Sequence, residues 1–447
     1  MHERTRNRSI AAVILIALIV LVSFVACGGE TTPPPTTTTE APPPSTAAPA
    51  TTTVSTQVAD SLPLGLLLAY SQFAVENGQV TANPGPAHLE LLSRAGGQWH
   101  TDVIDDPDSN VFHKALVYTP PGGTPGILTL GGTRARVLLW RHGASGWTSE
   151  TLWAEDFGGH FSRMRDAEIA NLYGDGPAIA VATHDQGVVA TIRAQAGGTW
   201  SVTRLDSRPN TFVHEIEIGD LDHDGVLEVY ATPSDPNDLD GGHQHGEVVR
   251  YLPSTGARTV VANLGNRHAK EIYVGDVDGD GTDELYVAVE ALTSGSGADL
   301  QIVEPVEIRR YDANTPADGG VVIATIRDRL TRFLTVGDID GDGHREMVVA
   351  AFSTGLWLVR PGRDPHGEWA IENIDRESGG FEHAALFADL DGDHRDELYV
   401  AADNQGELRR YAWDASGHAR RTVIHTRPIA SSMMTWNITT FPVSMLR

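Results

Sequence analysis

A short acidic segment recurs along the second half of the sequence, and this repeat limits the possible folds more than any other feature. Four copies of the pattern Asp-x-Asp-x-Asp begin at Asp220, Asp276, Asp338 and Asp389. Each copy is flanked by short runs rich in β-branched and aromatic residues, such as residues 228–232, which are typical of β-strands. A unit of this size cannot bury an apolar face alone, so the chain must pack several units around a shared core.

A second signal, a glycine-containing turn ahead of a short apolar run, extends the repeat over most of the chain. It occurs seven times, at intervals of 47 to 64 residues, with the turn glycines Gly97, Gly146, Gly198, Gly256, Gly320, Gly367 and Gly417. No long segment has a helical period, and a unit of about 50 residues has room for the four strands of a propeller blade. The sequence therefore predicts an all-β fold, a seven-bladed β-propeller over residues 60–447.

The two ends of this region are expected to meet in one blade. Only residues 59–64 precede the second strand of the first unit, near residues 65–70, so that unit lacks an innermost strand. Adding the last repeat interval to His383 gives Met433, which places residues 432–438 where an inner strand should lie. We therefore predict that the C-terminal strand closes the ring by completing the first blade.

The acidic segments have the side chains of a calcium-binding loop. Carboxylates occupy positions 1, 3, 5 and 9, and hard oxygen ligands at this spacing suit Ca²⁺. About four sites are predicted, with the ligands Asp220, Asp222, Asp224, Glu228; Asp276, Asp278, Asp280, Glu284; Asp338, Asp340, Asp342, Glu346; and Asp389, Asp391, Asp393, Glu397. In the last loop His394 replaces the turn glycine, and a decayed copy at Asn171 has Tyr173 at position 3 and is expected to bind no ion strongly. The alternative interpretation is that these segments are solvated hairpin turns.

The pattern Gly-Asp-x-Asp-x-Asp-Gly between two strands, as in residues 219–225, 275–281 and 337–343, resembles the FG-GAP/VCBS repeats of integrin-α-like β-propellers. This resemblance implies that calcium is structural and ties two strands of one blade together. It also implies that ligands bind at the face opposite the calcium loops, or at the rim.

The first 59 residues have a different composition and predict export. Arg4, Arg6 and Arg8 precede an uncharged apolar run, residues 10–25, that ends just before Cys27, the only cysteine. Residues 1–27 resemble the signal peptide of a bacterial lipoprotein, which implies a lipid anchor at Cys27; the alternative is an uncleaved membrane anchor. Residues 28–59 are rich in Thr and Pro and predict an extended, disordered stalk. The resemblance favours the cell envelope, at the outer membrane or cell surface.

Six residues before position 1 of each loop, at the start of each inner strand, the sequence has a basic or imidazole side chain. These residues, which we call the basic ring, are His113, Arg165, His214, Lys270, Arg332 and His383, and Met433 is the inferred seventh member. Because inner strands surround the propeller axis, we expect these side chains to converge at one mouth of the channel, and the histidines to respond to mild acid. The alternative is that they only line the channel and pair with neighbouring carboxylates.

Two classes of function remain open. The first is a ligand-binding or adhesion module that recognises an anionic glycan or an envelope protein at the channel mouth. The second is a uronate polysaccharide lyase, in which Arg neutralises a carboxylate and His removes the adjacent proton. A net charge of -26 argues against a nucleic-acid partner, and we expect a monomer. His243 and His245 are close enough in sequence to share a metal ion.

Overall fold

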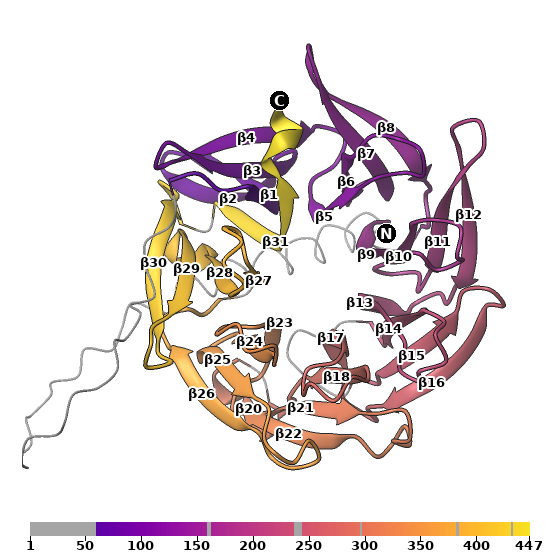
Figure 1. The fold of residues 1–447 in the computed structure, drawn as a ribbon, viewed down its shortest axis with the longest axis vertical. Helices are drawn as coiled ribbons and strands as arrows, with labels where there is room; N and C mark the ends of the chain where they lie inside the picture. Colours follow the sequence, from indigo (N-terminus) through magenta and orange to yellow (C-terminus); the bar gives the residue numbers. More distant parts are fainter. Residues whose placement is uncertain (1–59, 159–161, 237–243, 296, 381–383, 431) are drawn as a thin grey trace, which may run out of the picture.

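Seven antiparallel sheets surround a common centre, as predicted (Figure 1). The computed structural model describes residues 60–158, 162–236, 244–295, 297–380, 384–430 and 432–447. The predicted signal peptide and stalk, residues 1–59, lie outside the described residues. Within the described part of the chain, no helix is long and apolar enough to cross a bilayer.

Blades 2, 3 and 4 each contain four strands that are neighbours in both sequence and space. Blade 2 consists of β5 (Phe112–Tyr118), β6 (Gly126–Gly131), β7 (Arg136–Gly143) and β8 (Gly146–Ala154). Blade 3 consists of β9 (Met164–Ala170), β10 (Ala178–Thr183), β11 (Val189–Gln195) and β12 (Thr199–Asp206). Blade 4 consists of β13 (Phe212–Gly219), β14 (Glu228–Ser234), β15 (Glu247–Leu252) and β16 (Ala257–Asn263).

Blades 5, 6 and 7 follow the same order, except that blade 5 carries an extra hairpin. Blade 5 consists of β17 (Ala269–Gly275), β18 (Glu284–Val289), β21 (Val306–Tyr311) and β22 (Val321–Ile326), with the hairpin β19 (Leu292–Ser294) and β20 (Gln301–Glu304) around η1 (Gly297–Asp299). Blade 6 consists of β23 (Thr331–Gly337), β24 (Glu346–Ala351), β25 (Gly355–Arg360) and β26 (Ala370–Asp375). Blade 7 consists of β27 (Ala385–Ala388), β28 (Glu397–Ala402), η2 (Asp403–Gln405), β29 (Glu407–Trp413) and β30 (Ala419–Thr426).

Blade 1 is built from both ends of the described chain, which confirms the predicted closure. Its strands are β1 (Leu64–Glu76), β2 (Gln79–Pro84), β3 (Ala87–Ala95), β4 (Gln98–Asp106) and β31 (Met433–Pro442), and η3 (Val443–Leu446) ends the chain. β31 is the inner strand and pairs antiparallel with β1, from Leu64 opposite Pro442 to Gln72 opposite Met433. The ring is therefore closed by backbone hydrogen bonds between the first and last strands.

The burial of each strand follows its place in the blade. Every residue of the second strands β6, β10, β14, β18, β24 and β28 is buried, because both faces of these strands pack against neighbouring blades. The outermost strands, such as β26 and β30, are largely exposed. The apolar core is accordingly divided into clusters between adjacent blades, as where Ala180 of β10 and Val229 of β14 share one cluster.

Candidate functional site

The four acidic loops share one backbone geometry, in which the aspartate at position 1 organises the turn. Its side chain accepts a hydrogen bond from the backbone N–H at position 6, at 2.9 Å in all four loops. At position 6 of the last loop His394 adopts a φ of 68°, in the region that favours glycine, and still makes this bond. The histidine therefore leaves the loop conformation of blade 7 intact.

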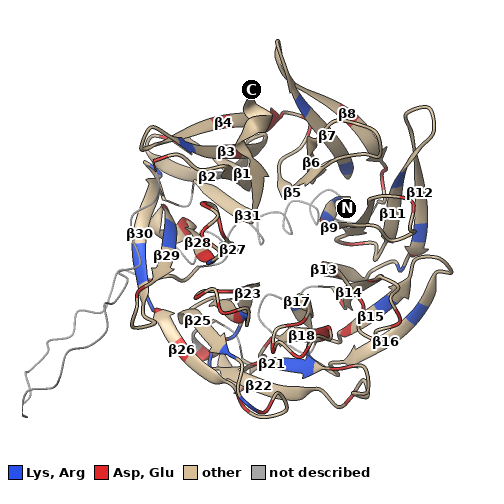
Figure 2. Ribbon diagram, viewed as in Figure 1, with Lys and Arg blue, Asp and Glu red and all other residues tan. Residues whose placement is uncertain are grey.

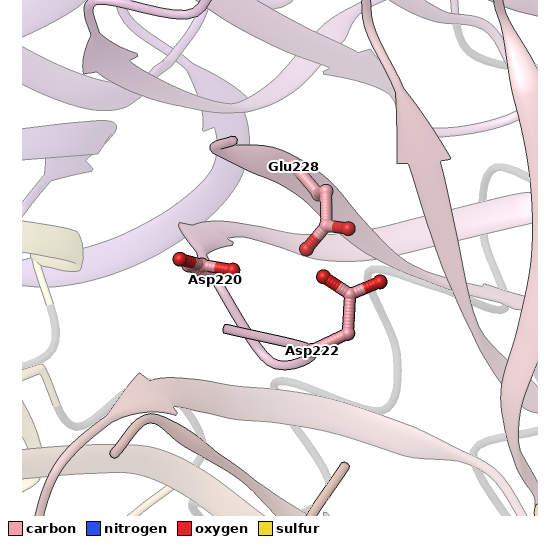
Figure 3. A group of neighbouring side chains, drawn as sticks. All are labelled: Asp220, Asp222 and Glu228. Carbon is pink, nitrogen blue, oxygen red and sulfur yellow. The ribbon is translucent and has the colours of Figure 1, made fainter. Parts of the chain in front are cut away.

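Three carboxylates of each loop converge. The ligand atoms lie within 4.8 Å of one another in the groups Asp220, Asp222, Glu228; Asp276, Asp278, Glu284; Asp338, Asp340, Asp342; and Asp389, Asp391, Asp393. Figure 3 shows the first group, in which the carboxylates of Asp222 and Glu228 face each other across the loop and Asp220 lies beside them. Each group could hold a metal ion. The predicted ligands Asp224, Asp280, Glu346 and Glu397 lie outside these groups.

One atom in these loops fits a cation directly. The side chain of Asp278 is only 6% exposed, and its Oδ1 has no hydrogen-bond partner among the described residues. Burial also raises the pKa of Glu284 and of Glu346 to about 7. A buried carboxylate oxygen without a donor is costly, and a divalent cation would satisfy it.

The decayed loop of blade 3 keeps the turn but has different chemistry. Asn171 at position 1 accepts the Gly176 N–H at 3.0 Å, as the aspartates do elsewhere. Arg193 forms an ion pair with Asp175, and its guanidinium lies 4.3 Å from the centre of the Tyr173 ring. An arginine from β11 thus supplies the positive charge in this loop.

A β-bulge occurs at the basic ring position of every inner strand whose pairing is described there. Arg165, Lys270 and Arg332 are each an extra residue with no counterpart on the second strand. In blades 2 and 4 a similar bulge contains His113 and His214, and Thr232 Oγ1 accepts the backbone N–H groups of both His214 and Glu215. Bulges redirect side chains, so the fold treats these five positions alike.

The seventh member of this set is Trp436, and the inference of Met433 was wrong. In β31 the bulge falls at Trp436, because Asn437 pairs with Ala69 and Thr435 pairs with Tyr70. Trp436 lies 53 residues after His383, three more than the interval of 50 on which the prediction of Met433 rested, and a fixed spacing cannot anticipate this. The sixth member, His383, lies outside the described residues.

Contacts between side chains connect the ring across blades. The ring of His113 lies 4.6 Å from that of Trp436, and the Arg165 guanidinium lies 5.4 Å from the Trp436 ring. Between blades 3, 4 and 5, the ring centres of His184 and His214 are 5.7 Å apart, and those of His214 and His268 are 5.9 Å apart. His184 and His268 are part of the arrangement although they are not on bulges, so the repeat spacing does not select them.

The imidazoles of His113, His214 and His268 are buried, and one nitrogen of each lacks a hydrogen-bond partner among the described residues. His113 and His214 are each 2% exposed and His268 is 5% exposed. The Nε2 atom of each has no hydrogen-bond partner in the part of the chain that the structure describes. Arg165 Nη1 donates to Nδ1 of His113 at 3.3 Å, so a neutral His113 carries its proton on Nε2. A hydrogen-bond donor is thus left unused in a buried place.

Burial and positive neighbours keep these histidines neutral. Burial lowers the pKa of His113 well below its usual value, and the charges of Arg163 and Arg165 lower it further. Burial, Lys270 and His268 do the same to the pKa of His214. The pKa of His268 falls to about 3 by burial, with Lys270 and Arg267 contributing. In the free protein these shifts oppose the expected response of His113 and His214 to mild acid, and His383 lies outside the described residues.

Two carboxylates near the ring accept backbone hydrogen bonds from the next blade. Asp166, which follows Arg165 directly in the sequence, lies 2.9 Å from Lys114 and accepts the backbone N–H of Ile216. Glu290 receives the N–H and hydroxyl of Thr331, and burial raises its pKa to about 7 although Lys270 and Arg332 oppose this. His184 is hydrogen-bonded to Asp185. Of the proposed metal pair, His243 lies outside the described residues, so that pair stays a prediction.

Comparison with known proteins agrees with the repeat and the fold. A family model described as an FG-GAP-like repeat matches residues 338–400, which include the acidic loops of blades 6 and 7. A search of curated proteins gave no match. The solved structures similar to this chain include a mutant of the Synechocystis apocarotenoid oxygenase, with 11% identity and a TM-score of 0.51 over 86% of this chain and 94% of that chain. They also include a protein from Lactobacillus plantarum, with 14% identity and a TM-score of 0.49 over 85% of this chain and 99% of that chain.

At such low identities the likeness to the oxygenase shows the fold alone. The family match carries more, because it falls on the segment whose acidic loops defined the repeat. Together with the closed ring of seven blades, this match over residues 338–400 supports an FG-GAP-like β-propeller.

Proposed function

We propose that this protein is an exported ligand-binding module in which calcium stabilises the propeller and the basic ring binds an anionic group. The ligand is a carboxylate, sulfate or phosphate carried by a glycan or by an envelope protein. Cys27 anchors the chain to a membrane through lipid, and residues 28–59 hold the propeller away from that surface.

The observation that carries the proposal is the set of unpartnered imidazole Nε2 atoms among fixed positive charges. Burial first, and then the charges of Arg163, Arg165, Lys270 and Arg332, lower the pKa values of His113, His214 and His268. An anion among these side chains would accept their unused hydrogen bonds and relieve the repulsion. The opposite sign of ligand is disfavoured, because a divalent cation would add to the same repulsion.

The burial of the ring limits what can enter. Lys270 and Arg332 are each 4% exposed, so a polymer cannot lie flat across them. A single charged group at the end or on a branch of a ligand fits this burial better. The lyase alternative is less well supported, since histidines with such low pKa values are weak bases.

Anion binding is tested by titrating a uronate oligosaccharide into the full chain and measuring heat in two buffers of different ionisation enthalpy. The bound anion should raise the histidine pKa values, so binding should take up protons, strengthen as pH falls and weaken as salt rises. The double variant Arg165→Ala, Arg332→Ala should lose binding. Arg193→Ala is the matched control, because Arg193 pairs with Asp175 away from the ring.

Equal binding by the double variant and the control would contradict the site. Absorbance from unsaturated sugar ends during the same incubation, lost in His214→Ala, would replace the binding module with a lyase.

The acidic loops are proposed to bind Ca²⁺ for structural reasons. Each loop joins the first and second strands of its blade, at the opposite end of the inner strand from the bulge. Bound calcium would satisfy Oδ1 of Asp278 and hold the two strands together. This role concerns stability, and the ligand site lies elsewhere.

A further inference from the structure

In three of the four acidic loops, the glutamate at position 9 is held by a tyrosine two residues later. Tyr230 donates its hydroxyl to Glu228 at 2.6 Å, Tyr286 to Glu284 at 3.0 Å, and Tyr399 to Glu397 at 3.1 Å. Directly opposite each tyrosine, on the third strand of the blade, stands an arginine: Arg250, Arg310 and Arg410. Blades 4, 5 and 7 therefore share a Glu, Tyr and Arg triad beside the loop.

The arginines of these triads bind the same carboxylates that would bind a metal ion. Arg310 Nη2 lies 2.9 Å from Glu284 and 3.1 Å from Asp278. Arg250 Nη1 lies 3.1 Å from Glu228 and also forms an ion pair with Asp222. Arg410 forms an ion pair with Glu397. Figure 2 shows the basic segments on β21 and β29 that carry Arg310 and Arg410.

The contacts in blades 5 and 7 are shielded from water, whereas Arg250 of blade 4 is 24% exposed. The side chains of Arg310 and Arg410 are each 3% exposed, and that of Glu284 is 1% exposed. Charges interact more strongly where water is excluded, so each guanidinium acts on its loop with little screening.

Blade 6 lacks the tyrosine and the arginine of the triad. Val348 and Leu358 occupy the paired positions that hold tyrosine and arginine in the other three blades. Among the described residues no ion pair to Glu346 is found, and the nearby Arg360 forms its ion pair with Glu372 at 3.1 Å. The loop of blade 6 has four carboxylates without a guanidinium bound to them.

We propose that the third-strand arginines set the calcium affinity of their loops and divide the sites into two classes. The loop of blade 6 is the tight site, whereas those of blades 4, 5 and 7 are weaker because a built-in positive charge opposes the ion and occupies one ligand. This inference rests on the proposed binding of calcium. The physical basis is that calcium affinity follows the net charge of the ligands.

The loop of blade 3 also binds a third-strand arginine, but from another position, because Val181 and Ala190 stand where the triads have tyrosine and arginine. Its carboxylates are reduced to Asp175, and Arg193 from the third strand binds that carboxylate. In that loop arginine is the sole described cation at the carboxylate.

The experiment compares Arg310→Met with Arg309→Met in the full chain by calorimetric titration of Ca²⁺. Arg309 is the matched control, because it lies on the same strand but pairs with Glu307 instead of the loop. Removing one positive charge beside a divalent ion should tighten one weak site about tenfold, whereas the control should leave every site unchanged. Leu358→Arg together with Val348→Tyr should weaken the tight site by a similar factor.

Terbium emission gives an independent readout, because Tyr230, Tyr286 and Tyr399 can each sensitise an ion in their own loop. In the wild type, the first equivalent of Tb³⁺ should fill blade 6 and give less tyrosine-sensitised emission than each later equivalent, because Tyr273 contacts that loop only through Arg345. Should Arg310→Met unfold the chain, Arg250→Met provides the same test in blade 4, where the arginine side chain is 24% exposed.

Two results would overturn the inference while leaving calcium binding in place. One is four sites of equal affinity in the wild type, and the other is a calcium affinity that is unchanged or weaker in a folded Arg→Met variant. A wild type that binds neither Ca²⁺ nor Tb³⁺ would overturn the calcium proposal as well.

Discussion

The low pKa of His268 should make the protein less stable in mild acid. Burial and the charges of Lys270, Arg267 and Arg332 lower the pKa of His268 to about 3 in the folded chain, from 6.5 for an exposed histidine. As pH falls below 6.5 the unfolded chain gains a proton that the folded chain does not, so the free energy of unfolding falls. For one such group the loss between pH 7 and pH 5 is about 2 kcal/mol.

The replacement His268→Gln removes this titration and keeps a side chain of similar shape. The free energy of unfolding should then vary less with pH, by about 2 kcal/mol between pH 7 and pH 5 compared with the wild type. Denaturant unfolding at a series of pH values and constant calcium measures the difference. His418→Gln is the control, since the side chain of His418 is 65% exposed.

Buried glutamates change the stability with pH in the opposite direction to His268. Burial raises the pKa values of Glu215 and Glu217, so these side chains take up protons more readily in the folded chain than in the unfolded chain. For that reason the test is the difference between variant and wild type. Identical pH dependences for His268→Gln and the wild type would refute the reasoning and mean that His268 is accessible to solvent.

Three further outcomes follow from the fold and the proposed function. Chelation of calcium should lower the melting temperature, because metal that binds only the folded form stabilises it, and an unchanged melt would contradict a structural role. Phe441→Ala should cost about 3–5 kcal/mol in denaturant unfolding, since the Phe441 ring is fully buried where β31 closes blade 1; a cost near zero would place closure elsewhere. Cys27→Ser should release the protein from isolated membranes, and retention would favour an uncleaved anchor.

The blade count and the acidic loops could be predicted from the sequence because each depends on local patterns. Glycine turns and short β-branched runs mark the strands, and the position 1 aspartate forms the same hydrogen bond in all four loops. Closure by the C-terminus was predictable because the first unit lacked a strand. The seventh residue of the ring could not be predicted, since the bulge of β31 falls at Trp436, three positions beyond the expected Met433.

The surroundings of the basic ring could not be predicted, because they depend on contacts between blades. The spacing selected His113, Arg165 and His214 but gave no sign that burial would keep the imidazoles neutral. His184 joins the arrangement from the end of a second strand, where its own repeat gives no signal. The triad arginines were missed for a related reason: they lie on the third strand, far along the chain from the loops they bind.

The position of the bulge is itself set by the neighbouring blade, which explains how basic side chains are held in a buried place. Glu290, after the second strand of blade 5, accepts the backbone N–H and the hydroxyl of Thr331 in blade 6. Asp403, after the second strand of blade 7, binds Thr435 of blade 1 in the same way. These threonines directly precede Arg332 and Trp436, so a carboxylate from one blade fixes the strand where the next blade bulges. The geometry of the ring therefore depends on the packing of adjacent blades, at the end of the inner strands away from the acidic loops.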